Sequence, residues 1–258
     1  MSNQEALAHY NVKKYRTPDG YTSDIAVFTI ISKGRVPYKP PQMELKLMLI
    51  RRSLTNSEGL PNIEGGKWAL PGGFVNENET SYETALRELK EETGVEQIHL
   101  QHFGVYDRPG RDPRGWIITN AFYAIVPEYA LQNRQAKDDA AAVELFTIQE
   151  ALQLDLAFDH AEIIRDAAAV ISRELLGTTI ARRFLPEEFT YSELRAVLLT
   201  VTDDPAIVSD AAFARKIKSL PFIEEVKGKK TTRTSKKPTQ LYRFNDIEIN
   251  QSIYTATY

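Results

Sequence analysis

The chain has 258 residues, of which 42% are hydrophobic and 26% charged, with a net charge of −3 at neutral pH. This composition is typical of a globular protein with one large domain or two ordinary ones. The absence of cysteine excludes disulfides, zinc–thiolate sites and a cysteine nucleophile. No apolar run reaches the roughly 18 to 20 residues of a membrane span, and the N-terminus lacks a signal-like apolar region, so we expect a cytoplasmic protein without membrane contact.

The charge is distributed unevenly along the chain. Between Phe213 and Phe244 there are ten basic and two acidic residues, a local net charge of +8, so the remainder of the chain carries −11. An acidic body followed by a basic C-terminal segment indicates two separate roles on one chain.

The first half of the chain predicts a sheet with long loops. Residues 24–32 are rich in β-branched and aromatic side chains, and residues 44–51 alternate between polar and apolar, so both are predicted strands. Two further strands are predicted at 98–106 and 116–126. Long polar loops around a compact sheet are where ligand contacts usually lie.

A helix is predicted between the second and third of these strands. Thr80 and Glu83 form a capping box that starts the helix directly after Thr80, and Gly94 suits the left-handed residue that ends it. Ala85 and Leu89 share one stripe of this helix and are expected to pack inward.

The same helix carries a cluster of carboxylates. Glu88, Glu91 and Glu92 fall on one face, where they repel one another unless a cation neutralises them. Hard oxygen ligands suit Mg²⁺ or Mn²⁺, so Glu88 and Glu92 are the predicted metal ligands. Glu91, Glu92 and Arg87 are the predicted catalytic residues, and Arg87 can orient Glu79 or a neighbouring carboxylate. The alternative is a solvated acidic helix face.

Residues 159–177 change to a helical pattern. Apolar side chains recur there at three- and four-residue spacing, and Gly177 fits a C-cap. A short basic stretch follows, and we place the domain boundary within 178–186. The predicted domains are residues 1–178 and residues 179–258.

The C-terminal domain predicts two capped helices and a hairpin. Thr190 and Glu193 form a second capping box, Ser209 can cap the next helix, and aspartates with Pro205 interrupt the chain between them. The predicted elements are helices over 191–201 and 210–220 and strands over 222–228 and 239–244. This order is that of a winged helix-turn-helix, in which one helix enters the major groove and a basic wing follows the backbone.

Basic residues of this domain are the predicted DNA contacts. Base edges are expected to meet the second helix, and phosphates are expected to meet the wing. The residues are Arg215 and Lys216 on the helix, and Lys229, Lys230, Lys236 and Lys237 in the wing. The alternative is that the lysine-rich wing is a solvated, partly disordered hairpin.

Residues 73–95 read GFVNENETSYETALRELKEETGV and fill every specified position of the Nudix box, a match expected by chance in about 10⁻⁹ of windows. The segment resembles the Nudix superfamily, which hydrolyses nucleoside diphosphates linked to another moiety. With KWALPGGFV, RDPRGW and LAFDHAEII, roughly residues 21–245 resemble the Nudix-related transcriptional regulators of NAD metabolism. Where that family has a Gly-Arg-Pro loop before Leu-Tyr-Arg-Phe, this chain has Lys236, Lys237 and Pro238 and lacks arginine's planar fork.

The resemblance implies an α+β chain: a Nudix α/β/α sandwich with a mixed sheet, followed by a winged helix-turn-helix domain. It implies a ligand-responsive repressor of NAD metabolism genes, with ADP-ribose or a related nucleoside diphosphate as signal and Mg²⁺ or Mn²⁺ as cofactor. It also implies a homodimer on two-fold operator DNA. The candidate ligand-binding residues are Arg51, Gly73, Arg111, Asp112 and Arg114. Bidentate arginine suits phosphate, and surface salt bridges are the alternative for the last three.

An enzyme remains the rival interpretation, since an intact box is compatible with an Mg²⁺-dependent ADP-ribose pyrophosphatase. The basic C-terminal segment favours the regulator, because a hydrolase has no use for it. No catalytic base outside the box is identified, although Glu144 is one candidate. We interpret Trp68 as a residue of core or dimer packing and His160 as a structural residue at a helix start.

Overall fold

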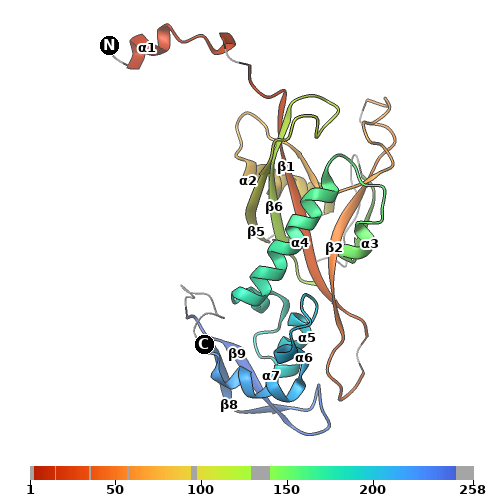
Figure 1. Cartoon of the computed structure of the whole chain (residues 1–258), viewed down its shortest axis with the longest axis vertical. Coiled ribbons are helices and arrows are strands. Elements are labelled where there is room, and N and C mark those ends of the chain that lie inside the picture. The colour runs from red at the N-terminus through yellow and green to blue at the C-terminus, as the bar shows by residue number, and fades with distance from the viewer. Residues whose placement is uncertain are drawn as a thin grey trace.

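The protein is described here from a computed structural model that covers residues 3–14, 16–34, 36–56, 58–93, 98–128 and 140–247. Figure 1 shows an elongated molecule, with a sheet and its helices in the upper part and a smaller helical and hairpin unit at the lower end. The N-terminal helix α1 (Asn3–Ala8) stands away from the body, has no buried residue, and is followed by the short helix η1 (Val12–Lys14). None of the helices in the described ranges is long and apolar enough to cross a membrane.

A mixed sheet forms the centre of the upper part. Its strands are β1 (Gly20–Ser32), β2 (Met43–Arg52), β3 (Trp68–Ala69), β4 (Gly72–Phe74), β5 (His99–Tyr106), β6 (Ile117–Ile125) and β7 (Ala140–Phe146). The central order is β3-β2-β1-β6-β5, while β4 pairs with β1 and β7 pairs with β2. Strands β1 and β6 run parallel and the other pairs are antiparallel.

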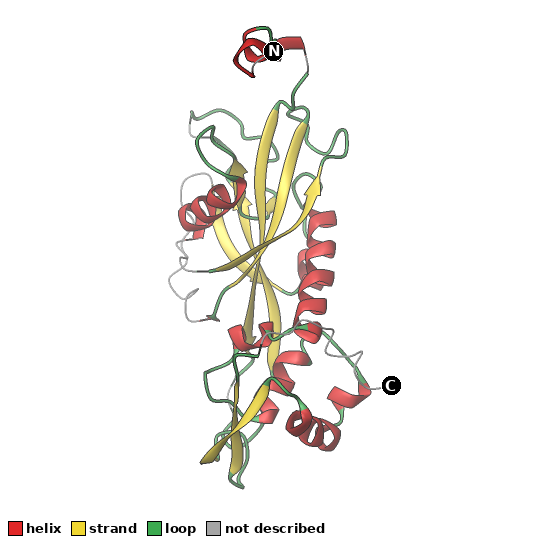
Figure 2. Cartoon of the chain, turned by 90° about the vertical axis from the view of Figure 1, so that its left-hand side faces the viewer, coloured by secondary structure: helices red, strands yellow, loops and turns green. Residues whose placement is uncertain are grey.

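Helices cover both faces of this sheet, as Figure 2 shows. The helices of this part are α2 (Ser81–Thr93), α3 (Ile148–Ala151) and α4 (His160–Gly177). Because side chains alternate along a strand, Ile25 and Val27 of β1 pack in the cluster on the α2 side, and Ala26 and Phe28 pack in the cluster on the α4 side. The predicted α/β/α sandwich with a mixed sheet is confirmed.

Capping boxes set the starts of two of these helices. The Thr80 backbone N–H donates to Glu83 at 2.8 Å, and the Glu83 N–H donates to the Thr80 hydroxyl at 3.2 Å, so α2 begins as predicted. Thr147 and Glu150 make the same reciprocal pair at the start of α3. Strand β7 and helix α3 were not predicted, although the TIQE pattern of this second box stands in the sequence.

The lower part begins at η3 and ends at a hairpin. Its elements are η3 (Ile180–Phe184), α5 (Tyr191–Leu198), α6 (Pro205–Val208), α7 (Asp210–Lys216), η4 (Ile217–Ser219), β8 (Ile223–Thr231) and β9 (Thr239–Phe244). Phe189 adds a bridge to Tyr242 of β9. This is a winged helix-turn-helix, as predicted. The predicted helix over 210–220 is divided, because the Ser219 hydroxyl donates to the Lys216 carbonyl in a tighter last turn and Pro221 follows.

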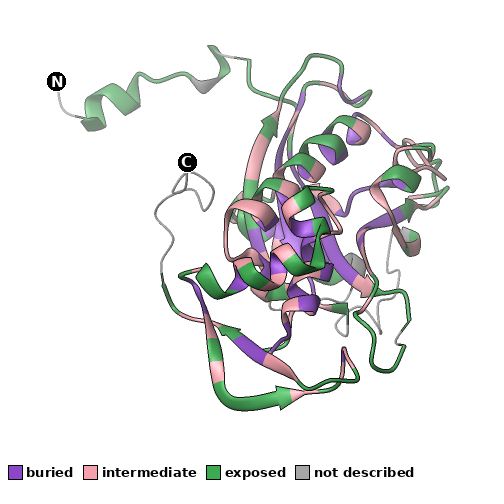
Figure 3. Cartoon of the chain, turned by 60° about the horizontal axis from the view of Figure 1, so that its bottom comes forward, coloured by how far each residue is buried: buried purple, intermediate pink, exposed green. Residues whose placement is uncertain are grey.

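The two parts share one hydrophobic core. A single cluster runs from Phe28 of β1 through Ile171 and Leu175 of α4 to Leu194 of α5 and Phe213 of α7. Outside the cluster, the hydroxyl of Ser172 on α4 donates to the carbonyl of Val201 at 3.2 Å. Figure 3 shows burial concentrated around the sheet and helices, and residues 227–230 of the β8–β9 hairpin are exposed. Helix α4 therefore contributes buried side chains to both parts. The domain division at residue 178 stays a prediction.

Candidate functional sites

Three carboxylates surround one guanidinium on α2. Arg87 donates from Nε and Nη2 to the two oxygens of Glu79 at 3.1 and 2.7 Å. Its Nη1 donates to Glu88 at 2.7 Å and to Glu91 at 3.2 Å, and Nη2 also reaches the Phe74 carbonyl of β4. The bidentate pair with Glu79 fixes the guanidinium, because a planar fork on a carboxylate defines its orientation.

The carboxylates differ in their environment. Hydrogen bonds from Arg87 hold the pKa of Glu79 at about 2, whereas burial raises the pKa of Glu88 although Arg87 also donates to it. Only 15% of the Glu88 side chain is exposed. A Cβ atom at Gly73 of β4 would lie 2.1 Å from Oε1 of Glu88, so any other residue there would displace this carboxylate.

The chemistry of this cluster suits a divalent cation. Glu88 and Glu91 offer the hard oxygen donors that Mg²⁺ and Mn²⁺ prefer, and Arg87 Nη1 now occupies the position between them. The Glu92 side chain lies outside the described residues. Within the described side chains, no group of three or more acidic or histidine residues is arranged to hold a metal. Glu88 and Glu92 as ligands therefore stay a prediction.

A polar pocket lies beside this cluster, between β1, β4, the loop after Arg108 and the start of α4. It is lined by Thr22, Asp24, Arg52, Leu70, Gly72, Gly73, Phe74, Arg111, Asp112, Arg114, Phe158 and His160. Four of the five predicted ligand-binding residues are among them. Gly73 lines the pocket and also packs on Glu88, so the pocket and the carboxylate cluster are contiguous.

Buried charges hold one side of the pocket. Arg111, with 3% of its side chain exposed, donates to Asp159 in a bidentate pair at 2.8 and 2.6 Å and lies 3.7 Å from Asp24. The Leu70 N–H donates to Nδ1 of His160 at 2.9 Å, and burial lowers the pKa of His160. The histidine is therefore neutral and holds the residue that follows β3 to the start of α4, which agrees with its interpretation as a structural residue.

Arg114 forms the other side. Its guanidinium lies 4.8 Å from the ring centroid of Phe74 and 4.9 Å from that of Phe158, a cation–π arrangement. Asp112 accepts from Nε and Nη2 of Arg114 at 3.0 and 2.6 Å. Burial raises the pKa of Asp112, but the hydrogen bonds from Arg114 keep this pKa below its ordinary value. The two aromatic rings and Asp159 were not predicted as part of the site, because the contacts that bring them there are long-range.

Arg51 lies elsewhere. Its side chain is exposed and its Nε donates to the Gly66 carbonyl at 3.0 Å, whereas the next residue, Arg52, lines the pocket. Successive side chains of a strand point to opposite faces of the sheet. The alternation along β2 could therefore have indicated that Arg52, and not Arg51, faces the pocket. Glu144 is exposed on β7 and does not line the pocket. Trp68 packs edge-on against Phe146 with ring centroids 4.9 Å apart.

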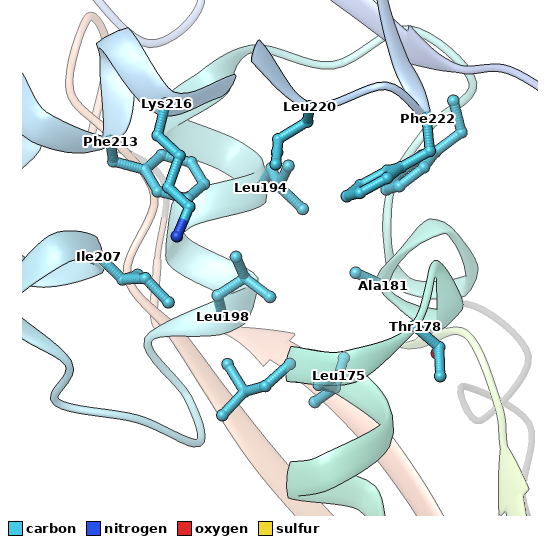
Figure 4. A pocket seen from close by; sticks show the side chains of 12 residues that line it. Leu175, Thr178, Ala181, Leu194, Leu198, Ile207, Phe213, Lys216, Leu220 and Phe222 are labelled. Carbon is cyan, nitrogen blue, oxygen red and sulfur yellow. The ribbon is translucent and has the colours of Figure 1, made fainter. Parts of the chain in front are cut away.

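The predicted DNA-binding residues of α7 differ in exposure. Arg215 is exposed, whereas Lys216 is half-buried and lines an apolar cavity of about 40 Å³ between α4 and the winged helix. Figure 4 shows the Lys216 side chain pointing into this cavity beside Phe213 and Leu198. In the wing, Lys229 pairs with Glu188 at 2.5 Å. The other predicted wing contacts, Lys230, Lys236 and Lys237, are exposed.

Both parts of the chain match known families. Residues 39–167 match the NUDIX domain, and residues 181–244 match the NrtR DNA-binding winged helix domain. The ADPR responsive transcriptional repressor NtrR of Acinetobacter baylyi is 30% identical over 253 residues, which cover 96% of this chain and 92% of the relative.

Two solved structures of Shewanella oneidensis NrtR resemble this protein. NrtR complexed with a 27mer DNA is 28% identical with a TM-score of 0.66, and the match covers 87% of this chain and 93% of that one. The NUDIX domain of NrtR complexed with ADP ribose is 30% identical with a TM-score of 0.52, covering 66% of this chain and 99% of that one. The fold of the chain and its matches to known families define a protein in which a Nudix domain is joined to a DNA-binding winged helix. The chain belongs to the NrtR family of Nudix-related transcriptional regulators.

Proposed function

We propose that this protein is an ADP-ribose-responsive transcriptional repressor of NAD metabolism genes. One observation carries the proposal: a Nudix unit with a polar pocket and a winged helix share one core, in a chain of which 96% aligns with a repressor named for its response to ADPR. The proposed location is the cytoplasm, in which a repressor would reach its DNA. A homodimer would present two copies of α7 to a two-fold operator.

The polar pocket is the proposed site for ADP-ribose. Gly73, Arg111, Asp112 and Arg114 line it, and Arg52 joins them. Arg114 holds its guanidinium between two aromatic rings with Nε and Nη2 bonded to Asp112, and we propose that its Nη1 donates to a diphosphate oxygen. Arg51 does not line the pocket and instead supports the loop at Gly66.

Slow hydrolysis is the second candidate function, because the Nudix box is complete and the described carboxylates lie beside the pocket. Mg²⁺ or Mn²⁺ bound there would neutralise diphosphate oxygens as a P–O bond breaks. This chain's own part is to hold Glu88 and Glu91 in place through Arg87, with Glu92 as the further proposed ligand. Formation of AMP and ribose 5-phosphate from ADP-ribose with Mg²⁺ tests the activity. No product after prolonged incubation would leave a binding-only domain.

Calorimetric titration with ADP-ribose tests the regulator, with and without a saturating duplex that the protein itself has selected from a random pool. Coupling between two ligands is reciprocal, so DNA must weaken ADP-ribose binding by the factor by which ADP-ribose weakens DNA binding. Equal ADP-ribose affinity in both titrations would exclude ADP-ribose as the inducer, even if both ligands bind well.

A further inference from the structure

The loop between β8 and β9, which forms the tip of the wing, is tied to the first turn of α5. Arg233 donates from Nε to Oε1 of Glu193 at 2.7 Å and from Nη2 to Oε2 of Glu193 at 2.6 Å. The same Nη2 donates to the Glu188 carbonyl at 2.7 Å. The Arg233 and Glu193 side chains are 27% and 13% exposed, so this fork pair is largely removed from solvent.

A second contact fixes the same loop. Thr234, which is buried, donates to the hydroxyl of Thr190, the residue that caps α5. Glu193 also accepts from the Thr190 N–H at 2.7 Å as the second half of the capping box. Two successive wing residues, Arg233 and Thr234, therefore attach to the cap of one helix.

The basic residues around this attachment are placed differently. In the part of the chain that the structure describes, Lys230, Lys236 and Lys237 are exposed and form no ion pair, whereas the charge of Arg233 is neutralised by Glu193. The guanidinium faces the protein with three hydrogen bonds. A phosphate contact by Arg233 would require those bonds to break.

We propose that Arg233 is a positioning residue for DNA binding. Through Glu193 it holds the wing against α5, so that the exposed lysines reach the phosphates, and it does not itself contact DNA. The physical gain is preorganisation: a loop rich in lysine, threonine and serine loses conformational freedom during folding instead of during binding. This inference rests on the proposed DNA-binding function.

Substitution of Glu193 separates this role from a phosphate contact. If Arg233 contacts phosphate, Glu193→Gln frees the guanidinium and removes a negative charge near DNA, so affinity rises. If Arg233 positions the wing, the same variant loosens the wing and affinity falls. Glutamine at this position preserves the capping box, so the start of α5 is maintained.

The experiment measures binding of the full-length protein to a fluorescein-labelled mixed-sequence duplex by anisotropy. Glu193→Gln and Arg233→Gln are each expected to weaken binding about three- to tenfold, and the double variant no more than either alone, because one interaction is lost. Glu187→Gln is the matched control: it removes the same charge from an exposed neighbour and should bind at least as well as the wild type. Unchanged ADP-ribose affinity checks that the Nudix part is intact.

Arg233→Lys provides a second test of the proposal if the glutamine variants fold poorly. It keeps the charge but cannot form the fork, so the positioning role predicts weakened binding and a phosphate contact predicts nearly full binding. Tighter binding by Glu193→Gln than by Glu187→Gln, or additive effects of the two single changes, overturns the proposal. A wild-type protein that binds no duplex refutes the proposed DNA-binding function, and the positioning role with it.

Discussion

At the scale of single residues, the carboxylate cluster on α2 has more negative charge than its arginine neutralises. Arg87 faces Glu79, Glu88 and Glu91 at once, and burial raises the pKa of Glu88. One guanidinium offsets one carboxylate, which leaves an excess that a divalent cation would remove. The arginine, anchored on Glu79, fixes the positions of Glu88 and Glu91, and metal binding at this cluster stays a prediction.

The double variant Glu88→Gln with Glu92→Gln should lose Mg²⁺ binding. Amide oxygens lack the charge that attracts the cation, and the inward stripe of α2, Ala85 and Leu89, is unaffected, so the fold should persist. Calorimetric titration with Mg²⁺ and Mn²⁺ measures the loss. Glu77→Gln, an exposed glutamate in the preceding loop, is the control. Unchanged metal affinity in the double variant would contradict the assignment of Glu88 and Glu92 as metal ligands.

Gly73→Ala should disturb the same site from the sheet side. The added Cβ would lie 2.1 Å from Oε1 and 2.3 Å from the carboxyl carbon of Glu88, so either β4 or the carboxylate must move. The carboxylate is the flexible end of the Glu88 side chain, so we expect it to move aside and weaken its hydrogen bond to Arg87, a loss of about 0.5 to 1.5 kcal/mol in the free energy of unfolding, measurable with urea. Gly177→Ala is the control, because its Cβ meets no atom within 4 Å. Equal stability of the two variants would contradict the close packing.

At the scale of elements, local signals in the sequence predicted most of the helices and strands. The capping boxes at Thr80 and Thr190, the β-branched and aromatic composition of β1 and the alternation of β2 act over a few residues, so they could be identified without a structure. The composition of the site could not be predicted in the same way. Asp159 reaches Arg111 across 48 positions, and no pattern of local spacing encodes such a contact.

The start of α4 should make stability depend on pH. Burial lowers the pKa of His160 below its ordinary value of 6.5, so below about pH 6.5 the unfolded chain binds a proton that the folded chain does not. The free energy of unfolding should therefore fall as the pH drops from about 6.5, by at most about 1.4 kcal/mol per pH unit.

Urea unfolding of His160→Gln between about pH 5 and 7 measures this contribution. The variant should show a flatter pH dependence than the wild type, because the buried imidazole is gone. His9→Gln, at an exposed position near α1, should keep the wild-type dependence. Identical slopes for His160→Gln and the wild type would show that another group is responsible.

The wing should act on DNA through phosphates. Replacement of Lys229, Lys230, Lys236 and Lys237 by alanine should weaken binding to all sequences and lower the salt slope by about 0.9 per lost contact. Arg215→Ala on α7 should instead reduce preference for the selected duplex, by about 1 to 3 kcal/mol if it meets a base. Anisotropy titrations across salt concentrations measure both, with the exposed Lys13→Ala as control. A salt slope unchanged by the quadruple variant would remove the wing from the interface.

At the scale of the whole molecule, the shared core should make the protein unfold as one unit. Leu175 of α4, Leu194 of α5 and Phe213 of α7 belong to the cluster that also contains Phe28 of the sheet. Calorimetry should therefore show a single transition, shifted upward by ADP-ribose as a whole. Circular dichroism and the fluorescence of the two tryptophans, Trp68 and Trp116, which both lie in the upper part, should give the same midpoint. Two transitions, with only one moved by the ligand, would mean separate domains.

The position of α4 also limits how this architecture can be recombined. One end of the helix borders the polar pocket through His160, and its other end closes the apolar cavity beside Lys216 through Leu175. In a chimera joined at residue 178, Leu194 and Phe213 of the transplanted winged helix would pack against the α4 of another protein. The Nudix part from which the winged helix was removed would expose the apolar side chains of its own α4. An exchange of sensors between relatives therefore has to match the residues that meet across α4 as well as the two parts that it joins.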